Sequence, residues 1–399
     1  MQAEFYKKKL KNGMTILLEK RNLPIVSVAF AVRAGGINET AQEKGISHYI
    51  EHMLYKGTPS RNTQKIASEI ERKGGILNGF TADAITAFWC KMPSKHLDTA
   101  LDVLSDMIKN PLFDKKELEK ERKVIFEEIK MRRDNPLIYV YDKIQSYLYK
   151  PPFGIPLIGT YESMNSLDKN KILEKFRQVY RPNNLVLCVV GNADFGNLAS
   201  FVEKTFGNEK GIIFQPKIQL KDEEGTEDRE GIDQANMVFA YHAPLAQNKL
   251  SYAALVLNTL MAGGMSSRLF SEIREKRNLA YAVKGEENTT KDFSYNMIYI
   301  GAMKENIEKI KSLILGEFDK VASSLDENEL NDVKNHVIGN HQISMEDSQG
   351  QMVNLLLHEI DGKVEDFYNF EKNILNVKLK EVQQLARIKK YSFFALAPK

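Results

Sequence analysis

The sequence predicts an α+β fold built as two similar α/β-roll domains, each a mainly antiparallel sheet packed with helices. The chain has 399 residues, which is typical of two domains rather than one. Helical and strand-like segments follow one another without the regular alternation of a parallel α/β fold. A strand–turn–helix pattern in the first half, AFWCKMPSKHLDTALDVLSDMI, recurs in the second half as YNMIYIGAMKENIEKIKSLILGEF, which suggests two similarly built domains.

The first elements along the chain are strands. EFYKKKL and MTILLEK flank Asn12-Gly13, a pair favoured in two-residue type I′ turns, and together they predict a β-hairpin. A β-rich run from Ile25 to Ala34 follows and ends at Gly35-Gly36. Further strands are expected at Ile76–Phe80, Ala84–Met92 and Asn184–Val190.

Helical patterns lie between these strands. They predict helices over residues 43–57, 62–73, 94–109, 114–133 and 168–179. The helix over 62–73 starts with Asn and Thr and stops at Gly74-Gly75, as helix caps require. Residues 217–233, KIQLKDEEGTEDREGID, are polar and dense in charge, which is typical of an exposed linker. We therefore predict a first domain over 1–212, a charged linker over 213–233 and a second domain over 234–399.

Composition disfavours several classes of protein. Lys and Arg number 56 against 53 Asp and Glu, and a net charge of +3 argues against a dedicated nucleic-acid binder. Cys90 and Cys188 sit in apolar runs and are too few for a disulfide framework or a cysteine metal cluster. No apolar stretch approaches the roughly 18 residues of a membrane span, and no hydrophobic region follows the N-terminal lysines. We expect a cytoplasmic protein without a membrane or nucleic-acid partner, although a mature form that had lost a presegment would look the same.

The sharpest chemical signal is the run His48-Tyr49-Ile50-Glu51-His52. On a helix, His48 and His52 stand about 40° apart around the axis, and Glu51 lies on the same side. Two imidazoles one turn apart can grip one metal ion, and zinc suits a set of nitrogen and oxygen donors. Glu51, close but not coordinating, would take a proton from water at the metal and later give it to a leaving amine. The alternative is that both histidines only make polar contacts on a helix face.

The next predicted helix offers a third protein ligand. Glu121 and Glu128 are seven residues apart in ELEKERKVIFEEIKMRRD and only about 20° apart in helical projection, so both can face one site. Glu127 is rotated by about 100° from its neighbour and is expected to face elsewhere. Taken alone, this charged stretch is more typical of a solvated helix.

Together these residues resemble a known family. The order H-x-x-E-H, followed 76 positions later by Glu128 with Glu121 seven before it, is similar to the inverted-zinc-motif peptidases. These inverzincins include pitrilysin, insulin-degrading enzyme and mitochondrial processing peptidase. The chain looks like a short two-domain, bacterial-type, processing-peptidase-like member, and YRPNNLVLCVVGNAD resembles the strand that closes the family's first domain.

The resemblance implies a role for each residue of this set. His48, His52 and Glu128 would ligate one zinc ion per chain, and Glu51 would be the general base. Glu121 would be the family's second acidic residue, which supports the ligands from behind. We count it with Glu51 among the expected catalytic residues.

A possible substrate-binding strand follows the metal motif. GGILNGFTADAITAFWC is similar to the family's Gly-x-x-Asn-Ala-x-Thr strand, whose edge pairs with an extended substrate peptide. Asn78 is the matching polar residue, and Gly79 stands where alanine is usual. Pairing with the main chain of a substrate tolerates varied side chains. The alternative is an ordinary strand with a turn-forming Asn-Gly.

The second half adds no metal ligands. GGMSSRLFSEIREKRNLAYAV predicts an N-capped amphipathic helix with a basic end, followed by a strand. The family's second-half domains carry an Arg and a Tyr seven residues apart, and Arg274 and Tyr281 match that spacing. The resemblance implies that this pair holds the substrate carbonyl and stabilises the oxyanion, for which both donors are suited. Asn278 replaces the glycine common before Leu-Ala-Tyr, a departure that could alter the loop.

The expected assembly follows from the number of domains. Larger members hold four such domains on one chain and enclose a chamber, whereas this chain has two. We therefore expect a homodimer in which Arg274 and Tyr281 of one protomer face the zinc of the other. The expected activity is that of a zinc-dependent metalloendopeptidase that hydrolyses peptides or unfolded segments inside this two-chain chamber. The alternatives are a non-catalytic subunit of the same fold and an active subunit that needs a different partner chain.

Overall fold

The computed structural model describes residues 4–362 and 364–399, and the chain forms two compact units. The first unit contains the chain up to residue 129 together with residues 157–217 and 344–360. The second contains residues 130–156, 218–343 and 361–399. The division predicted from the sequence follows chain order, whereas each compact unit takes one segment from the opposite half of the chain.

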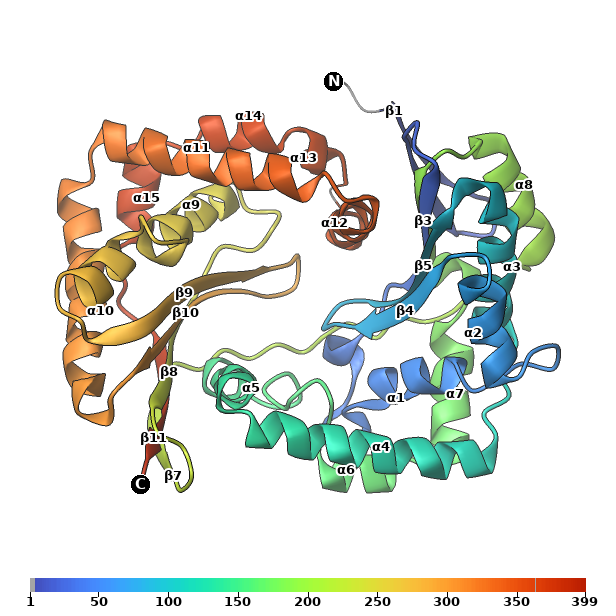
Figure 1. Ribbon diagram of the computed structural model, residues 1–399, viewed down its shortest axis with the longest axis horizontal. Helices are drawn as coiled ribbons and strands as arrows, with labels where there is room; N and C mark the ends of the chain where they lie inside the picture. The colour runs from blue at the N-terminus through green and yellow to red at the C-terminus, as the bar shows by residue number, and fades with distance from the viewer. Residues whose placement is uncertain (1–3, 363) are drawn as a thin grey trace. The chain divides into compact units, whose positions relative to one another are not determined.

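A six-stranded sheet lies at the centre of the first unit (Figure 1). Across the sheet, its strands are β1 (Glu4–Lys9), β2 (Thr15–Lys20), β6 (Leu185–Gly191), β3 (Ile25–Val32), β5 (Thr86–Pro93) and β4 (Ile76–Thr81). All neighbours pair antiparallel except β2 and β6, which run parallel. The inner strands are almost entirely buried, in keeping with their continuous apolar sequences. Strand β4 therefore forms one edge of the sheet.

The predicted hairpin is present, but its turn differs from the prediction. The amide of Gly13 donates to the carbonyl of Leu10 at 2.9 Å, and the amide of Leu10 donates to the carbonyl of Met14 at 2.8 Å. Gly13 has a φ of +92°, whereas Asn12 is not among the residues with positive φ. Because a type I′ turn needs positive φ at both central residues, the connection is instead a three-residue loop with glycine in the left-handed position.

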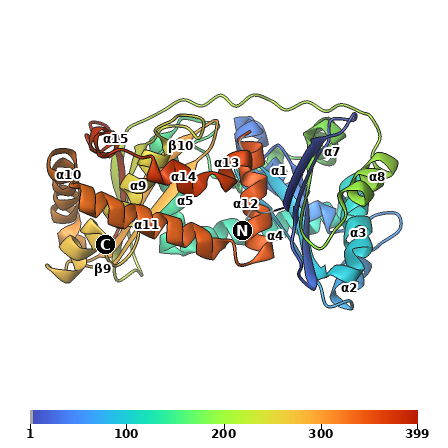
Figure 2. The same cartoon turned by 90° about the horizontal axis from the view of Figure 1, so that it is seen from above.

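Helices cover both faces of this sheet. α3 (Leu97–Lys109) packs on β3 and β5, and α8 (Phe195–Thr205) packs on β2. α12 (Ser348–Ile360) packs on β3 and β6, on the face opposite α3 and α8 (Figures 1 and 2). A helix from the C-terminal half of the sequence thus completes the first unit.

Further helices lie around this sheet. They are α1 (Ile46–Leu54), α2 (Thr63–Glu71), α6 (Tyr161–Ser166) and α7 (Lys169–Val179). The long helix α4 (Lys115–Asp134) starts in the first unit and enters the second after Ile129.

The second unit is built around a five-stranded sheet. Across it, the strands are β7 (Glu224–Arg229), β11 (Ser392–Pro398), β8 (Ala235–His242), β10 (Ser294–Ala302) and β9 (Ala280–Thr289). β7 and β11 run parallel, and the other pairs are antiparallel. α9 (Ser251–Ala262) packs on β9 and α10 (Ile307–Ser324) on β8. α5 (Pro136–Leu148), from the N-terminal half of the sequence, packs on β8 and β11.

Further helices belong to the second unit. They are the π-helix η5 (Phe270–Glu275), α11 (Glu327–Ser344), α13 (Val364–Tyr368), α14 (Phe370–Leu375) and α15 (Leu379–Leu385). Across the described residues, every helix is too short or too polar to traverse a lipid bilayer.

The two sheets repeat one topology. The order β2-β6-β3-β5-β4 in the first unit matches β7-β11-β8-β10-β9 in the second, and in both a parallel pair is followed by three antiparallel pairs. The strand–turn–helix pattern seen twice in the sequence corresponds to β5–α3 and to β10–α10. The predicted α+β fold with two similar, mainly antiparallel domains is therefore confirmed.

Candidate metal centre

Helix α1 has one face in the hydrophobic core and another face at the candidate metal site. Its buried side chains include Tyr49 and Met53, whereas His48, Glu51 and His52 are only partly buried and lie together on another face. This division follows from the spacing of 3.6 residues per turn.

The start of α1 is fixed by a buried carboxylate. Glu39 accepts hydrogen bonds from the backbone amides of Gly45 at 3.0 Å and Ser47 at 2.8 Å. These amides belong to the first turn, where helical N–H groups have no helical partner and where negative charge is favoured. The ammonium of Lys44, fully buried, lies 3.9 Å from Glu39 and donates to the carbonyl of Gly36 at 2.8 Å. These contacts therefore fix the position of the first turn of the helix that carries His48 and His52.

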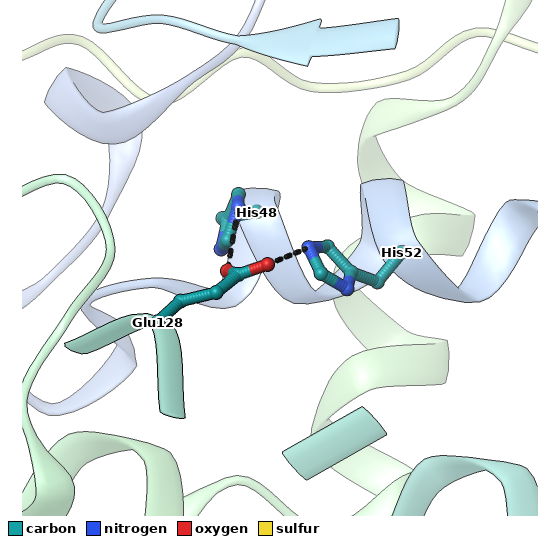
Figure 3. Close-up of side chains that lie close together, drawn as sticks. All are labelled: His48, His52 and Glu128. Atoms are coloured by element: carbon teal, nitrogen blue, oxygen red, sulfur yellow. Dashed lines mark ion pairs between the residues drawn. The ribbon is translucent and has the colours of Figure 1, made fainter. Parts of the chain in front are cut away.

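The structure brings His48, His52 and Glu128 together (Figure 3). One potential ligand atom from each residue lies within 4.8 Å of the other two. The Nε2 atoms of His48 and His52 each lie 3.7 Å from one of the two carboxylate oxygens of Glu128. Glu128 reaches this point from α4, and its neighbour Glu127 is exposed.

This geometry fits a zinc ion. Zinc bonds to imidazole nitrogen and carboxylate oxygen are about 2.0–2.2 Å long, so neighbouring ligands on a tetrahedral ion are roughly 3.4 Å apart. The two Nε2–oxygen separations of 3.7 Å are close to this value and too long for hydrogen bonds. Two imidazoles and one carboxylate also leave a fourth position for water, as catalytic zinc sites require.

Glu121 supports one of the candidate ligands from behind. Its Oε2 lies 3.1 Å from Nδ1 of His52, and its Oε1 lies 2.7 Å from the ammonium of Lys56. A carboxylate that accepts a hydrogen bond from Nδ1 keeps the proton on that nitrogen. Nε2 is then unprotonated, and its lone pair points toward Glu128. Glu121 is buried, so the contact is shielded from water.

Glu51 lies beside the candidate ligands without belonging to their cluster. Its Oε2 accepts a hydrogen bond from the Thr81 hydroxyl at 2.8 Å, which ties α1 to β4. Burial raises the pKa of the Glu51 carboxyl, and the charge of Glu128 adds to this effect, whereas the Thr81 hydrogen bond and His52 oppose it. A carboxyl with a raised pKa is suited to accept and return a proton near neutral pH.

The predicted substrate strand is β4, at the edge of the first sheet. Asn78 is exposed, and its side-chain oxygen accepts a hydrogen bond from the amide of Gly79 at 2.8 Å. Since β4 pairs with β5 on one side only, its other side offers backbone groups to a further strand.

Arg274 and Tyr281 lie in the second unit, and both side chains are exposed to solvent. Arg274 is on η5 and stacks over the ring of Phe270 at 4.7 Å, with 42% of its side chain exposed. Tyr281 is on β9, is 48% exposed, and its hydroxyl lies 3.3 Å from that of Tyr299. The Tyr299 hydroxyl in turn donates to the side-chain oxygen of Asn236 at 2.7 Å. The segment predicted as an amphipathic helix is a π-helix where it carries Arg274.

Several residues of the site were not predicted. Thr81 occupies the threonine of the Gly-x-x-Asn-Ala-x-Thr pattern, so the motif contained a signal for its contact with Glu51. Glu39, Lys56 and Tyr299 carry no local pattern, and only folding brings them to their partners.

Comparison with known protein families places the chain in one of them. The sequence profile described as "Insulinase (Peptidase family M16)" matches residues 15–161, and that described as "Peptidase M16 inactive domain" matches residues 166–337. The candidate metal residues and Glu51 fall within the first match, and Arg274 and Tyr281 fall within the second. The chain belongs to the insulinase family of peptidases, family M16, as a short two-domain member.

Relatives and solved structures agree with this placement. An "Uncharacterized zinc protease" of Rickettsia felis is 32% identical and covers 87% of this chain and 85% of its own length. YmxG of Bacillus subtilis, also named an uncharacterized zinc protease, is 31% identical and covers 94% and 93%. The crystal structure of a protease from Helicobacter pylori has a TM-score of 0.92 at 20% identity and covers 99% of this chain and 100% of its own. That of a peptidase M16 inactive domain from Pseudomonas fluorescens has a TM-score of 0.88 at 18% identity, covering 99% and 98%. Both structures share the two-domain fold.

Proposed function

We propose that this protein is a zinc-dependent metalloendopeptidase. The observation that carries the proposal is the convergence of His48, His52 and Glu128 on one point, with Glu51 beside them on the same helix. His48, His52 and Glu128 would hold one zinc ion per chain. A bound zinc ion would supply Lewis-acid chemistry, activating water and polarising a peptide carbonyl.

The protein's own groups would carry the proton transfers. Glu51 would accept a proton from the attacking water and deliver it to the amine that leaves when the peptide bond breaks. Thr81 holds Oε2 of Glu51, and the carboxylate fixed in this way would act on the reacting water. Burial makes this carboxyl a stronger base than a solvated glutamate. Glu121 would keep His52 in the tautomer that binds metal.

The substrate would bind as an extended strand. The free side of β4, next to Asn78 and Gly79, would pair with the main chain of the peptide and so accept varied sequences. Substrates of this kind are short peptides and unfolded segments, because folded proteins seldom present free strands.

Arg274 and Tyr281 would stabilise the oxyanion, and we propose that they do so across a homodimer. Both side chains are exposed and carry donors that suit developing negative charge. In this proposal, the pair of one protomer meets the metal centre of the other, and two chains together enclose the chamber.

Glu51→Gln tests the proposed chemistry. Gln keeps the size of the side chain but cannot accept a proton, so we expect hydrolysis of an unstructured fluorogenic peptide to fall by about 10²–10⁴-fold. Zinc content, measured by metal analysis of the purified protein, is expected to stay at one ion per chain. Glu127→Gln on the exposed side of α4 is the matched control and is expected to leave turnover unchanged. Undiminished turnover by Glu51→Gln, or wild-type hydrolysis that resists a chelator, contradicts the proposal.

A further inference from the structure

A departure from the family pattern lies directly beside Glu51. Gly79 stands where alanine is usual in the substrate strand, and its backbone has no special conformation that would require glycine. A Cβ atom at this position would lie 2.5 Å from the hydroxyl oxygen of Tyr55, 2.9 Å from the carbonyl of Ala87 and 3.3 Å from Oε1 of Glu51. The tightest of these approaches is to Tyr55, so the Tyr55 hydroxyl occupies the space that an alanine side chain would fill.

The Tyr55 hydroxyl is unusual in its surroundings. It is buried, and among the residues that the structure describes none hydrogen-bonds to it. Tyr55 follows the last turn of α1, and its ring packs against that of Phe88 at 5.9 Å. A buried hydroxyl without a partner is costly, since it has given up its bonds to water. The cost is explained if the hydroxyl bonds to a group that moves during the reaction.

The Glu51 carboxylate is a charged acceptor close to this hydroxyl. Oε2 of Glu51 accepts the hydrogen bond from Thr81. Oε1 of Glu51 and the Tyr55 hydroxyl both lie next to the space that a Cβ atom on Gly79 would occupy. Burial, followed by the negative charge of Glu51, raises the pKa of the Tyr55 hydroxyl, so it keeps its proton and is a donor. A neutral donor beside a carboxylate forms a bond about twice as strong as one between neutral groups.

We infer that Tyr55 is a positioning residue for Glu51 and that Gly79 is required to accommodate its hydroxyl. The inference rests on the proposed function, because it gives Tyr55 its role through the general base. Thr81 and Tyr55 then each serve one oxygen of the carboxylate, which fixes its orientation toward the reacting water. A phenylalanine at position 55 would leave Oε1 without this donor.

The first test measures turnover. Tyr55→Phe is expected to lower kcat by about tenfold, the usual effect of losing one hydrogen bond to a charged group, with KM and zinc content unchanged. Tyr241→Phe removes a buried hydroxyl in the second unit and is the matched control, with kcat expected to stay unchanged. An unchanged kcat in Tyr55→Phe overturns the positioning role.

The second test asks whether the Tyr55 hydroxyl occupies the space beside Gly79, and it does not depend on activity. Thermal unfolding is compared for wild type, Gly79→Ala, Tyr55→Phe and the double variant, as a double-mutant cycle. Gly79→Ala is expected to lower Tm by several degrees when Tyr55 is present and by much less when position 55 is Phe. The contact with the Ala87 carbonyl is common to both backgrounds and cancels. Equal losses of Tm in the two backgrounds overturn the pairing.

The two tests separate this inference from the proposed function. A wild-type protein without chelator-sensitive hydrolysis contradicts the proposed function and, with it, the positioning role of Tyr55. An active wild type with unchanged kcat in Tyr55→Phe contradicts the present inference alone.

Discussion

Glu121 connects the candidate metal ligand His52 to the surrounding protein. It contacts Nδ1 of His52 on one side and the ammonium of Lys56 on the other. Removing such a supporting carboxylate typically weakens metal binding by about 10–100-fold, because the imidazole loses its preferred tautomer and orientation. We expect Glu121→Ala to weaken zinc binding by this factor, measured by competition with a chromogenic chelator. Glu119→Ala, on the exposed face of the same helix, should bind zinc like the wild type, and equal affinities for all three proteins would contradict the role.

Much of the candidate metal centre could be predicted from the sequence, because helical geometry is local. The spacing of His48, Glu51 and His52 fixes their relative directions on one helix, and the spacing of Glu121 and Glu128 does the same on another. The hydrogen bond from Thr81 to Glu51 could not be predicted in this way. It depends on how a strand packs against a helix, and no local periodicity encodes that packing.

Asn278 shows why a departure from a family pattern can be harmless. It replaces a glycine, and its φ is +53°, in the left-handed region. Asparagine is one of the few residues other than glycine that adopt this conformation readily. The turn before β9 is therefore retained, and the strand that carries Tyr281 starts at Ala280.

At the scale of elements, the docking of α12 on the first sheet relies on charged groups. Arg33, just after β3, pairs with the buried carboxylate of Glu359 at 2.6 Å, and Lys7 lies 2.9 Å from its other oxygen. We expect Arg33→Met to lower the free energy of unfolding by about 2 kcal/mol in urea titrations, because Glu359 would remain buried with one partner. Lys20→Met, which breaks an exposed pair with Glu4, is the control, with an expected change below about 0.5 kcal/mol. Equal effects of the two substitutions would argue against this docking role.

Two elements that the sequence analysis did not predict, α5 and β7, pack on or pair with distant parts of the second sheet. α5 contains a run of β-favouring residues, LIYVY, yet it is helical. The side chain of Asn135 caps its first turn, Pro136 occupies the first position, and the sheet of the second unit provides a surface to pack on. β7 lies within the predicted charged linker and has no apolar pattern. It is a strand because β11, more than 160 residues later, supplies its backbone partners.

At the scale of the whole molecule, the proposed sharing of sites between protomers can be tested by mixing inactive variants. Glu51→Gln and Arg274→Ala protomers are unfolded or dissociated together and reassembled. If the site is shared, each mixed dimer regains one complete site, and random pairing should restore about a quarter of wild-type hydrolysis. A mixture of Glu51→Gln with His52→Ala is the control and should remain inactive, since both defects lie in the same half of the site. No recovery in mixed dimers of verified composition contradicts sharing.

The exchange of helices between the two units has a consequence for synthesis of the chain. Because translation proceeds from the N-terminus, β3 and β6 are made long before α12, which covers one of their faces. The first unit, which contains His48 and His52, therefore cannot be completed until residue 360 has emerged from the ribosome. A prematurely terminated product would expose one apolar face of its sheet and would be a target for cellular quality control. Incomplete chains therefore cannot form the finished first unit.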